Sequence, residues 1–387
     1  MKSQERRDFL KKATAASLLS AMGTPGFGKV PNPIENSNDP VSFSGDGLYL
    51  SPNEYSQLLT RLTTDNAAEA DNYSLGGCVE ALETKFATLL GKEAAIFMPT
   101  GTLANQLALR ALCHEKSSHR VIIQHESHIY NDTGDACQLL SNLNLIPLGA
   151  NRATFTLDEV EEVVKRTAGG RVAARVGAIS IESPVRRKMG EVFDFAEMKK
   201  IAAFAKANDI GMHLDGARLF LATPYTGVKV TDYSSLFDTV YVSLYKYFNA
   251  ASGAILAGPK SLIAPMYHTR RMFGSGLPQS WPFALVAGHF AEGFPERFAK
   301  AVTQSETLIK RLATHPQFEI QRIPEGTNLF RLTIKGVPAK TLAETLKTNG
   351  VIARADSATT LLLSVNESIL RRSADELEAI FVKSLNS

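Results

Sequence analysis

A single lysine, Lys246, follows directly on an apolar run at residues 239–244 that is typical of a buried strand. Two tyrosines flank it, Tyr245 and Tyr247, and small residues then lead to a second apolar run at 254–257. Burial disfavours the charged ammonium group, so a lysine at the end of a core strand is expected to have a lowered pKa. A neutral amine can attack a carbonyl carbon and form a Schiff base. The position of Lys246 therefore predicts covalent chemistry.

A carboxylate, Asp215, ends another apolar run, within the segment His213-Leu-Asp-Gly-Ala-Arg218. A buried carboxylate needs a cation or hydrogen-bond donors to offset its desolvation. Arg218 could be that cation, as a structural partner. Alternatively, Asp215 faces a protonated ring nitrogen while Arg218 binds the carboxylate of a substrate. The residues alone leave both interpretations open.

Two more segments place polar groups after predicted strands. In residues 99–105, the backbone N–H groups of Gly101 and Thr102 begin a predicted helix and would form a site for an anion such as phosphate. A histidine after the strand at 121–123 can stack on an aromatic ligand or transfer protons. A hydrogen-bonded structural role is slightly more expected for His125 than for His128.

An amine, a carboxylate and a phosphate site are together the three requirements for binding pyridoxal phosphate. Other ligands fit the sequence less well. No GxGxxG follows a predicted strand, no glycine-rich GK[ST] run is present, and no HExxH motif occurs. The three cysteines, Cys78, Cys113 and Cys137, are scattered and suggest neither a disulfide framework nor a metal site.

The elements around these residues alternate between short apolar strands and amphipathic helices from about residue 94 to residue 244. This alternation predicts an α/β fold with a large domain, in which helices sandwich a mostly parallel sheet. Ligands of such sheets bind beyond the carboxyl ends of the strands. Lys246 and Asp215 both stand at such ends.

The pattern changes at about residue 291, where a long helix at 294–313 is followed by short strands and a last helix with a capping box at Ser373. This indicates a small α+β domain. The predicted organisation is an export leader at 1–30, a linker and N-terminal segment at 31–70, a large domain at 71–290 and a small C-terminal domain at 291–387.

The first 30 residues differ from the rest in charge. They carry six basic and two acidic residues, so the net charge of +3 becomes −1 without them, and no basic run in the body suggests nucleic-acid binding. Arg6-Arg7, followed by Phe9-Leu-Lys11 and a weakly apolar stretch, resembles a twin-arginine export signal. Glu5 departs from that pattern, and an amphipathic helix on a cytoplasmic protein is the alternative. No segment is apolar for long enough to predict a membrane span.

In sequence order, several segments resemble the β-eliminating lyase and threonine aldolase family of pyridoxal phosphate enzymes, which have the aspartate aminotransferase fold (fold type I). The matching segments are residues 91–105, His128, residues 213–219, Lys246 and residues 270–279. The resemblance covers roughly residues 40–387. It implies pyridoxal phosphate as cofactor and an amino acid as substrate.

The resemblance also implies a role for each matching residue. Lys246 would bind the cofactor covalently, and Asp215 would pair with the pyridine nitrogen to keep it protonated. His128 would stack on the ring. Gly101 and Thr102 would hold the phosphate through their backbone N–H groups.

Arginines complete the implied site. Arg218 would grip the substrate carboxylate, and Arg270 would reach a phosphate across a subunit interface, which implies a homodimer or homotetramer. A second carboxylate-binding arginine of the family falls near Leu361 in this chain. The residues that could replace it, or could simply be exposed charges, are Arg186, Arg187 and Arg354.

Further departures concern the substrate. Tyr245 and Tyr247 stand where threonine aldolases usually have serine and glycine, and Val185 stands where the family has a histidine thought to assist the aldol step. An N-terminal serine contact falls near Gly45. The residues implied for cofactor binding are thus retained, while some of those implied for substrate binding differ.

The leading hypothesis is an aldolase-type lyase that cleaves a β-hydroxy-α-amino acid, such as threonine or allo-threonine, into glycine and an aldehyde. The alternative is β-elimination on another amino acid, which releases ammonia and a keto acid; the missing histidine favours it slightly. A non-catalytic exported binding protein is a third hypothesis, and the intact Lys246 and Asp215 argue against it.

Overall fold

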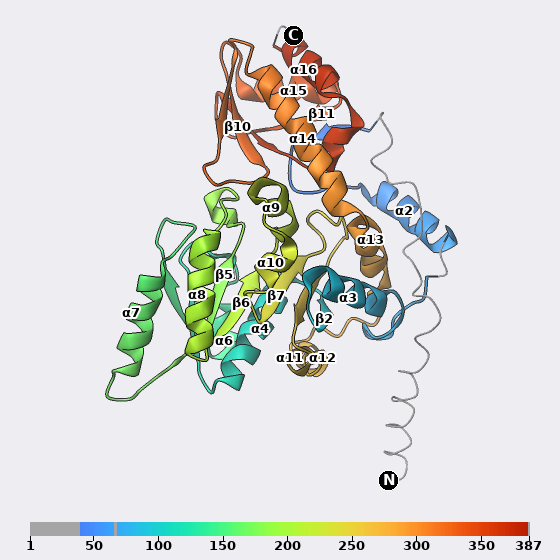
Figure 1. Cartoon of the computed structure of the whole chain (residues 1–387). Coiled ribbons are helices and arrows are strands. Elements are labelled where there is room, and N and C mark those ends of the chain that lie inside the picture. The colour runs from blue at the N-terminus through green and yellow to red at the C-terminus, as the bar shows by residue number, and fades with distance from the viewer. Residues whose placement is uncertain (1–38, 66–67, 386–387) are drawn as a thin grey trace.

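The structure, a computed structural model, describes residues 39–65 and 68–385 (Figure 1). The predicted export leader at 1–30 lies outside these residues. The described chain begins with β1 (Val41–Ser42) and α2 (Pro52–Asp65). The predicted capping box at the start of α2 is confirmed, because Ser51 N donates to Glu54 Oε2 at 2.6 Å and Glu54 N donates to Ser51 Oγ at 3.3 Å.

A seven-stranded sheet forms the centre of the large domain. Its strands lie in the order β2 (Ala94–Met98), β8 (Ala254–Gly258), β7 (Thr239–Ser243), β6 (Gly211–Asp215), β5 (Val176–Glu182), β3 (Arg120–Gln124) and β4 (Asn144–Leu148). Strand β8 is antiparallel to both of its neighbours, and every other pairing is parallel. The predicted mostly parallel sheet is therefore confirmed, and β2, β3, β5, β6 and β7 all end at the same edge.

Both faces of this sheet are buried, and alternate residues of one strand belong to different cores. In β3, Val121 and Ile123 pack into one hydrophobic cluster with Leu107 of α4, whereas Ile122 packs into the other. This alternation follows from the period of two in a strand. Helices on both faces are the reason that the strands are apolar throughout, as expected for parallel sheets.

Most helices of the large domain lie between two successive strands of the sheet in the sequence. Those that cover it or join its strands are α3 (Gly77–Leu90), α4 (Gly101–Glu115), α5 (His128–Asn131), α6 (Ala136–Ser141), α7 (Leu157–Ala168), α8 (Phe195–Ala207), α9 (Leu219–Thr226), α10 (Val230–Ser234), α11 (Lys260–Ile263), α12 (Met266–Met272) and α13 (Trp281–Ala291), with a short 3-10 helix η3 (Arg186–Lys188). The capping box predicted at Thr156, before α7, is confirmed.

The C-terminal part lies above the large sheet in the view of Figure 1, and the long helix α14 (Phe294–Leu312) runs up into it from α13. It has a four-stranded antiparallel sheet in the order β12 (Arg354–Ala355), β13 (Thr360–Ser364), β10 (Leu329–Ile334) and β9 (Phe318–Arg322). The other elements are α15 (Ala339–Thr348), β11 (Val351–Ile352), the 3-10 helix η4 (Glu367–Arg371) and α16 (Ala374–Lys383), whose capping box at Ser373 is also as predicted. The small α+β unit is therefore confirmed as a fold.

From Val41 on, the N-terminal segment joins this C-terminal part. Strand β1 pairs in parallel with β11, more than 300 residues away in the sequence, and Ser364 N donates to Phe43 O at 2.8 Å. From there the chain passes towards α2 along the large domain. Residues 44–50 are thus positioned between the two parts, and the exact boundary at 290 stays a prediction.

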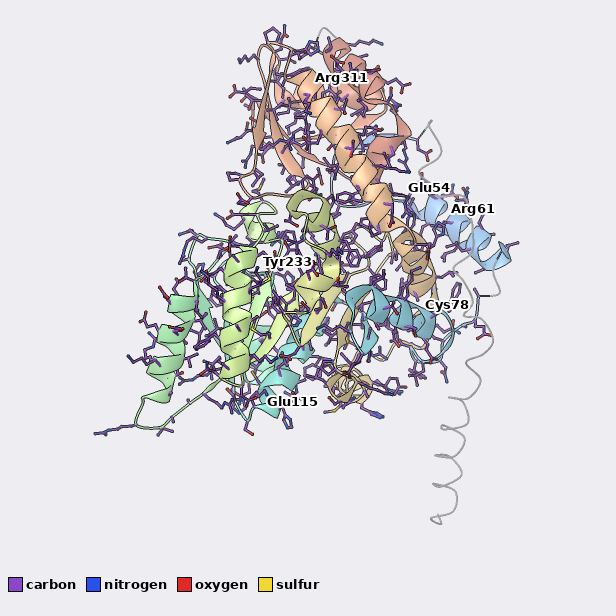
Figure 2. The ribbon with its side chains drawn as sticks, viewed as in Figure 1. Glu54, Arg61, Cys78, Glu115, Tyr233 and Arg311 are labelled. Atoms are coloured by element: carbon purple, nitrogen blue, oxygen red, sulfur yellow. The ribbon has the colours of Figure 1, made fainter. Side chains whose placement is uncertain are left out.

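The three cysteines are all buried and free, with Cys78 on α3 (Figure 2). In the described ranges, no helix is both long and apolar enough to cross a bilayer.

Candidate active site

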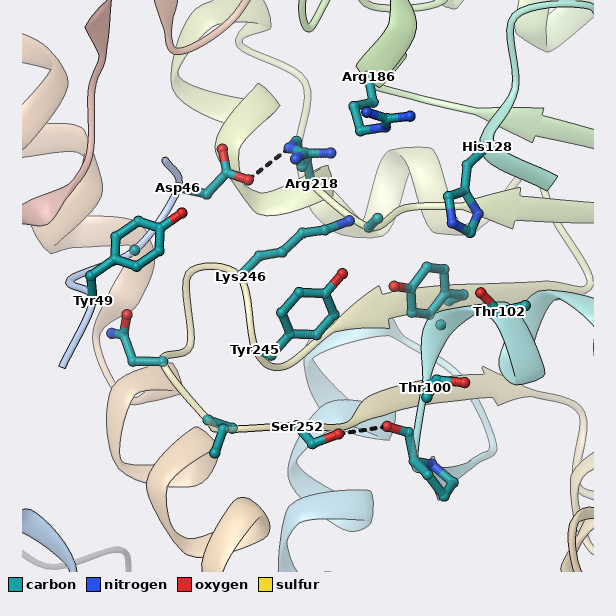
Figure 3. A pocket seen from close by; sticks show the side chains of 18 of the residues that line it. Asp46, Tyr49, Thr100, Thr102, His128, Arg186, Arg218, Tyr245, Lys246 and Ser252 are labelled. Carbon is teal, nitrogen blue, oxygen red and sulfur yellow. Dashed lines mark hydrogen bonds and ion pairs between the residues drawn. The ribbon is translucent and has the colours of Figure 1, made fainter. Parts of the chain in front are cut away.

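The strand ends at one edge of the large sheet surround a cavity of about 1110 Å³ (Figure 3). Six of the seven site residues predicted from the sequence line it, namely Gly101, Thr102, His128, Asp215, Arg218 and Lys246. They follow four different strands, β2, β3, β6 and β7, whose parallel direction brings their ends together. The position of the cavity is therefore a consequence of the sheet topology.

Lys246 lies three residues beyond β7, and its side chain extends across the cavity, with Arg218 on one side and the Tyr245 ring on the other (Figure 3). Its Nζ atom is 5.7 Å from the centroid of that ring. Burial, reinforced by the positive charge of Arg218, lowers the pKa of Lys246 to about 8. The expected desolvated amine is thus present, on the wall of the cavity.

The two tyrosines beside the lysine have different environments. Tyr245 lines the cavity and is 49% exposed, whereas Tyr247 is 1% exposed and packs against Phe248 and Phe294 at centroid distances of 4.5 and 5.2 Å. Tyr247 therefore belongs to the core between the large domain and α14. Of the two departures from the aldolase pattern, only Tyr245 can contact a ligand.

The lowered pKa of Lys246 predicts how the rate of cofactor capture depends on pH. Because the amine loses its proton at about pH 8 rather than near its ordinary value of 10.5, the rate at which the apoprotein binds pyridoxal phosphate should rise with pH, with a midpoint near 8. Stopped-flow absorbance measures this rate. Arg218→Gln should move the midpoint upward, since it removes the neighbouring positive charge. A midpoint near 10.5 in the unaltered protein would contradict the burial of Lys246.

Asp215, the last residue of β6, is 4% exposed and has no ion pair with Arg218. Its Oδ2 atom accepts a hydrogen bond of 2.5 Å from Asn105 Nδ2, and its Oδ1 atom accepts one of 3.1 Å from Ala217 N. Both donors are neutral groups, and no ion pair of the carboxylate occurs among the described residues. The geometry favours the second of the two interpretations that the sequence left open.

The N-terminus of α4 faces the same cavity. Thr100 is the N-cap residue, and its hydroxyl accepts from Leu103 N at 3.2 Å. The backbone N–H groups of Gly101 and Thr102 have no acceptor among the residues that the structure describes. Free N–H groups at the positive end of a 15-residue helix are suited to a phosphate.

Gly101 is held close to a neighbouring strand, which gives a sharp test of this phosphate site. A Cβ atom at residue 101 would lie 2.0 Å from the hydroxyl oxygen of Tyr241, so either the Tyr241 ring, which also lines the cavity, or the helix N-terminus must shift in Gly101→Ala. We expect the dissociation constant for pyridoxal phosphate to rise tenfold or more, on the order of the effect of a 1 Å displacement. Equilibrium titration followed by fluorescence measures it.

Gly169→Ala is the matched control, because its backbone has an ordinary φ of −83° and its new Cβ would meet nothing closer than 3.4 Å. It should bind the cofactor like the unaltered protein. If Gly101→Ala also did so while unfolding at an unchanged temperature, the phosphate assignment would be wrong.

His128 begins α5, and its imidazole lies over the cavity near Thr102 (Figure 3). The ring nitrogens have no hydrogen-bond partner within the described part of the chain, while the backbone N–H donates to Glu182 Oε2 at 2.6 Å. His125, in contrast, bonds to Glu126 at 2.9 Å and does not line the cavity. The expectation that His125 is the more structural histidine agrees with this geometry.

Glu182, at the end of β5, holds two parts of the site in place. Its carboxylate accepts from the backbone N–H groups of His128 and Arg186, at 2.6 and 2.8 Å. Burial and the nearby charge of Asp215 raise the pKa of Glu182 above its ordinary value. The role of Glu182 was not predicted from the sequence. Arg186 is four residues after it, but His128 is 54 residues before it, and only the fold brings the three together.

Arg218 lines the cavity and pairs with Asp46 of the N-terminal segment, at 2.8 Å between Nε and Oδ2. Asp46 also accepts from Asn328 Nδ2 at 3.3 Å. One nitrogen of the guanidinium is therefore fixed, and the other two remain for an anion. Asp46 was not predicted, because its partner is 172 residues away in the sequence.

A second cavity of about 210 Å³ adjoins the first and shares Asp46, Arg186 and Arg218 with it. Arg354 of β12 lines this second cavity, and its guanidinium forms no hydrogen bond or ion pair with another residue in the described ranges. Arg187 lines neither cavity and pairs with Asp132 at 3.3 Å. Of the three candidate replacement arginines, Arg186 and Arg354 are therefore the ones near the site.

The remaining departures from the family lie as follows. Val185 is fully buried, and its backbone N–H donates to Glu191 O. Its side chain is a hydrocarbon and therefore supplies no acid or base. Leu361 is fully buried in the C-terminal sheet, and Gly45 lines the second cavity.

Arg270, the seventh predicted residue, does not line either cavity. It is 1% exposed, donates to the backbone oxygen of Phe97 and lies over the Tyr267 ring at 5.5 Å. To reach a phosphate in a neighbouring subunit, its guanidinium would have to leave these partners. That role stays a prediction, and the burial of the side chain within its own chain is an argument against it.

The residues around the larger cavity fit pyridoxal phosphate. The cofactor needs an amine for its aldehyde, an anion site for its phosphate and a carboxylate for its ring nitrogen. Lys246, the N-terminus of α4 and Asp215 provide these three, and they do so at one edge of one sheet. The two hydrogen-bond donors to Asp215 are neutral, which is the observation that best suits a protonated ring nitrogen as its further partner.

Comparison with known proteins agrees with this chemistry. The family model described as beta-eliminating lyase matches residues 60–358. A Schizosaccharomyces pombe protein named as a low-specificity L-threonine aldolase is 32% identical over 275 residues, which are 70% of each chain.

Two solved structures are also similar. A Listeria monocytogenes protein described as an L-allo-threonine aldolase is 28% identical, with a TM-score of 0.73 over 91% of this chain and 97% of its own. An Exiguobacterium protein described as an aromatic amino acid beta-eliminating lyase/threonine aldolase is 26% identical, with a TM-score of 0.74 over 92% of this chain and 99% of its own. Since the family match spans most of the chain and the fold agrees, the chain belongs to the β-eliminating lyase family.

Proposed function

We propose that this protein is a pyridoxal phosphate-dependent lyase that cleaves a β-hydroxy-α-amino acid of the threonine or allo-threonine type into glycine and an aldehyde. The observation that carries the proposal is the meeting of Lys246, Asp215 and the N-terminus of α4 around one cavity. The names of the similar proteins support the substrate class.

Each residue has a distinct task in this proposal. The Lys246 amine would bind the cofactor aldehyde, the N–H groups of Gly101 and Thr102 would bind the phosphate, and Asp215 would hold a proton on the ring nitrogen. Arg218 orients the substrate through its carboxylate. Bound in this way, the cofactor supplies an electron sink for the pair released when the Cα–Cβ bond breaks.

The cleavage needs a group that takes the proton from the β-hydroxyl oxygen. As Val185 offers none, we propose His128, because its ring lines the cavity and its nitrogens form no hydrogen bond with a described residue. The hydroxyl proton leaves to the imidazole, the C–O bond becomes the aldehyde carbonyl and the Cα–Cβ bond breaks. Cα then takes up one proton, so the products together contain the atoms of the substrate.

β-Elimination remains the second candidate, because Val185 replaces the histidine and because one similar structure is described as a beta-eliminating lyase/threonine aldolase. Product analysis distinguishes the two reactions. The purified protein with pyridoxal phosphate is incubated with L-threonine, L-allo-threonine, L-serine and phenylserine. Equal amounts of glycine and aldehyde are expected. Ammonia and a keto acid in equal amounts would replace the proposal with β-elimination, and no product from any substrate would remove both.

Arg354 should contribute to substrate binding, because its guanidinium has no partner among the described residues and lies on the wall of the cavity that Arg218 also lines. We expect Arg354→Ala to raise KM on the order of tenfold, as for a lost hydrogen bond to a charged group, with a smaller change in kcat. Arg187→Ala is the matched control, since Arg187 lines neither cavity, and its KM should stay unchanged. Equal effects of the two substitutions would exclude a specific role of Arg354.

We further propose that the chain forms a homodimer or homotetramer and that its leader directs export by the twin-arginine route. Large exposed apolar side chains support the oligomer, namely Tyr73, Leu75 and Met272. They lie on two segments that are in contact, because Arg271 stacks on the Tyr73 ring at 4.6 Å. The paired arginines at 6 and 7 support export. Light scattering tests the subunit number, and cell fractionation with Arg6→Lys/Arg7→Lys tests export.

A further inference from the structure

Behind Asp215 lies a row of three polar side chains that the mechanism above does not use. Asn105 Nδ2 is 2.5 Å from Asp215 Oδ2, Asn105 Oδ1 is 2.9 Å from His213 Nε2, and His213 Nδ1 is 2.8 Å from Thr239 Oγ1. All three side chains are completely buried, and none of them lines either of the two cavities described above. They come from α4, β6 and β7, three elements that meet under the site.

With Asp215 ionised, the chemistry of the groups determines the direction of each hydrogen bond in this row. The Asp215 carboxylate can only accept, so Asn105 donates through its amide nitrogen and must accept through its oxygen. His213 therefore carries its proton on Nε2 and accepts on Nδ1. Thr239 must then donate its hydroxyl proton to His213.

All three donors thus point along the row towards Asp215. Hydrogen bonds aligned in one direction polarise one another, and this effect is stronger in a buried environment. The row consequently stabilises negative charge on the Asp215 carboxylate. Burial lowers the pKa of His213 to about 4, so this residue stays neutral and adds no positive charge that would compete with a cation in the cavity.

We propose that Asn105, His213 and Thr239 are positioning residues, which keep Asp215 ionised and oriented so that the proton it shares with the cofactor stays on the ring nitrogen. A carboxylate without these donors would be desolvated and could take that proton itself, leaving two neutral partners. The inference rests on the part of the proposed function that places pyridoxal phosphate in this cavity. It does not depend on which amino acid is cleaved.

The test uses pyridoxal phosphate labelled with ¹⁵N in the ring, whose NMR shift reports whether the ring nitrogen carries a proton. The unaltered holoprotein should show a protonated nitrogen at neutral pH. Asn105→Leu, which removes the donor to Asp215 at similar volume, should move the shift towards the unprotonated form. It should also raise the dissociation constant of the cofactor about tenfold, as for a lost hydrogen bond to a charged group.

The effect should decrease along the row, because each substitution further from Asp215 leaves more donors in place. His213→Phe should cause a smaller shift than Asn105→Leu, and Thr239→Val, which keeps the shape of the side chain, the smallest. His213→Gln should restore the shift, since its amide N–H can donate to Asn105. A purely structural role would instead lower the unfolding temperature of the apoprotein without changing the ¹⁵N shift.

The outcomes separate this inference from the proposed function. If all variants that fold keep the shift and affinity of the unaltered protein, the inference is wrong, whatever the protein catalyses. If the shifts follow the predicted order but no hydroxy amino acid is cleaved, only the reaction is wrong. An unaltered protein that binds no pyridoxal phosphate would overturn both.

Discussion

Lys246→Ala is expected to remove activity almost completely, with kcat/KM reduced on the order of 10³-fold or more, because no other amine can bind the cofactor covalently. Among the described residues that line the cavity, Lys246 is the only lysine. The visible absorbance band of the bound cofactor should disappear as well. Glycine release and absorbance spectra measure the two effects on the same preparation.

Lys92→Ala is the matched control for this substitution. Lys92 is also desolvated, with a lowered pKa, but it donates to Phe237 O at 2.5 Å and lines neither cavity. Its loss should reduce stability while the absorbance band and kcat remain. If Lys246→Ala kept the band and the activity, the assignment of the nucleophile would be refuted.

Asp215→Asn should have the second largest effect, a decrease in kcat of about 10² to 10³-fold, because it removes the charge that stabilises a protonated ring nitrogen and keeps the shape of the side chain. The substrate should still bind through Arg218, so KM should change much less than kcat. Steady-state kinetics separate these parameters. A substitution that raised KM alone would instead make Asp215 a substrate-binding residue.

Asp238→Asn controls for the loss of a carboxylate from the sheet. Asp238 accepts from Met212 N at 2.8 Å at the amino end of β7, which is the opposite edge from the cavity. We expect its kcat to equal that of the unaltered protein. A similar decrease for both substitutions would point to a general effect on the sheet.

Much of the fold could be predicted because its signals are local. Alternating apolar runs and amphipathic segments gave the order of strands and helices, and the capping boxes at Thr156 and Ser373 marked helix starts correctly. The antiparallel direction of β8 was not predicted, since an apolar run has no direction of its own. Strand β1 was missed because its partner, β11, lies at the other end of the chain.

The site could likewise be predicted only where its signals are local in the sequence. Residues that follow strand ends in the sequence, such as Lys246 and Asp215, could be placed together because parallel strands end at one edge. The partners of those residues could not. Asn105 is 110 residues from Asp215, and Asp46 is 172 residues from Arg218, so only the packing of the fold brings each pair into contact.

The flanking tyrosines show the same limit in one short segment. As neighbours of Lys246 they look equivalent in the sequence, yet they point in different directions, because the chain turns after β7. Tyr247 fills an aromatic core against α14, and Tyr245 lines the cavity. Of the two flanking tyrosines, only Tyr245 is therefore placed to contact a substrate.

The central claim is that the amine of Lys246 binds pyridoxal phosphate. Its most direct test is reduction of the holoprotein with borohydride, which fixes the cofactor to the lysine that holds it, followed by peptide mass spectrometry. The account predicts one modified peptide, with the added mass on Lys246. Modification of a different lysine, or of none although the protein retains the cofactor, would contradict it.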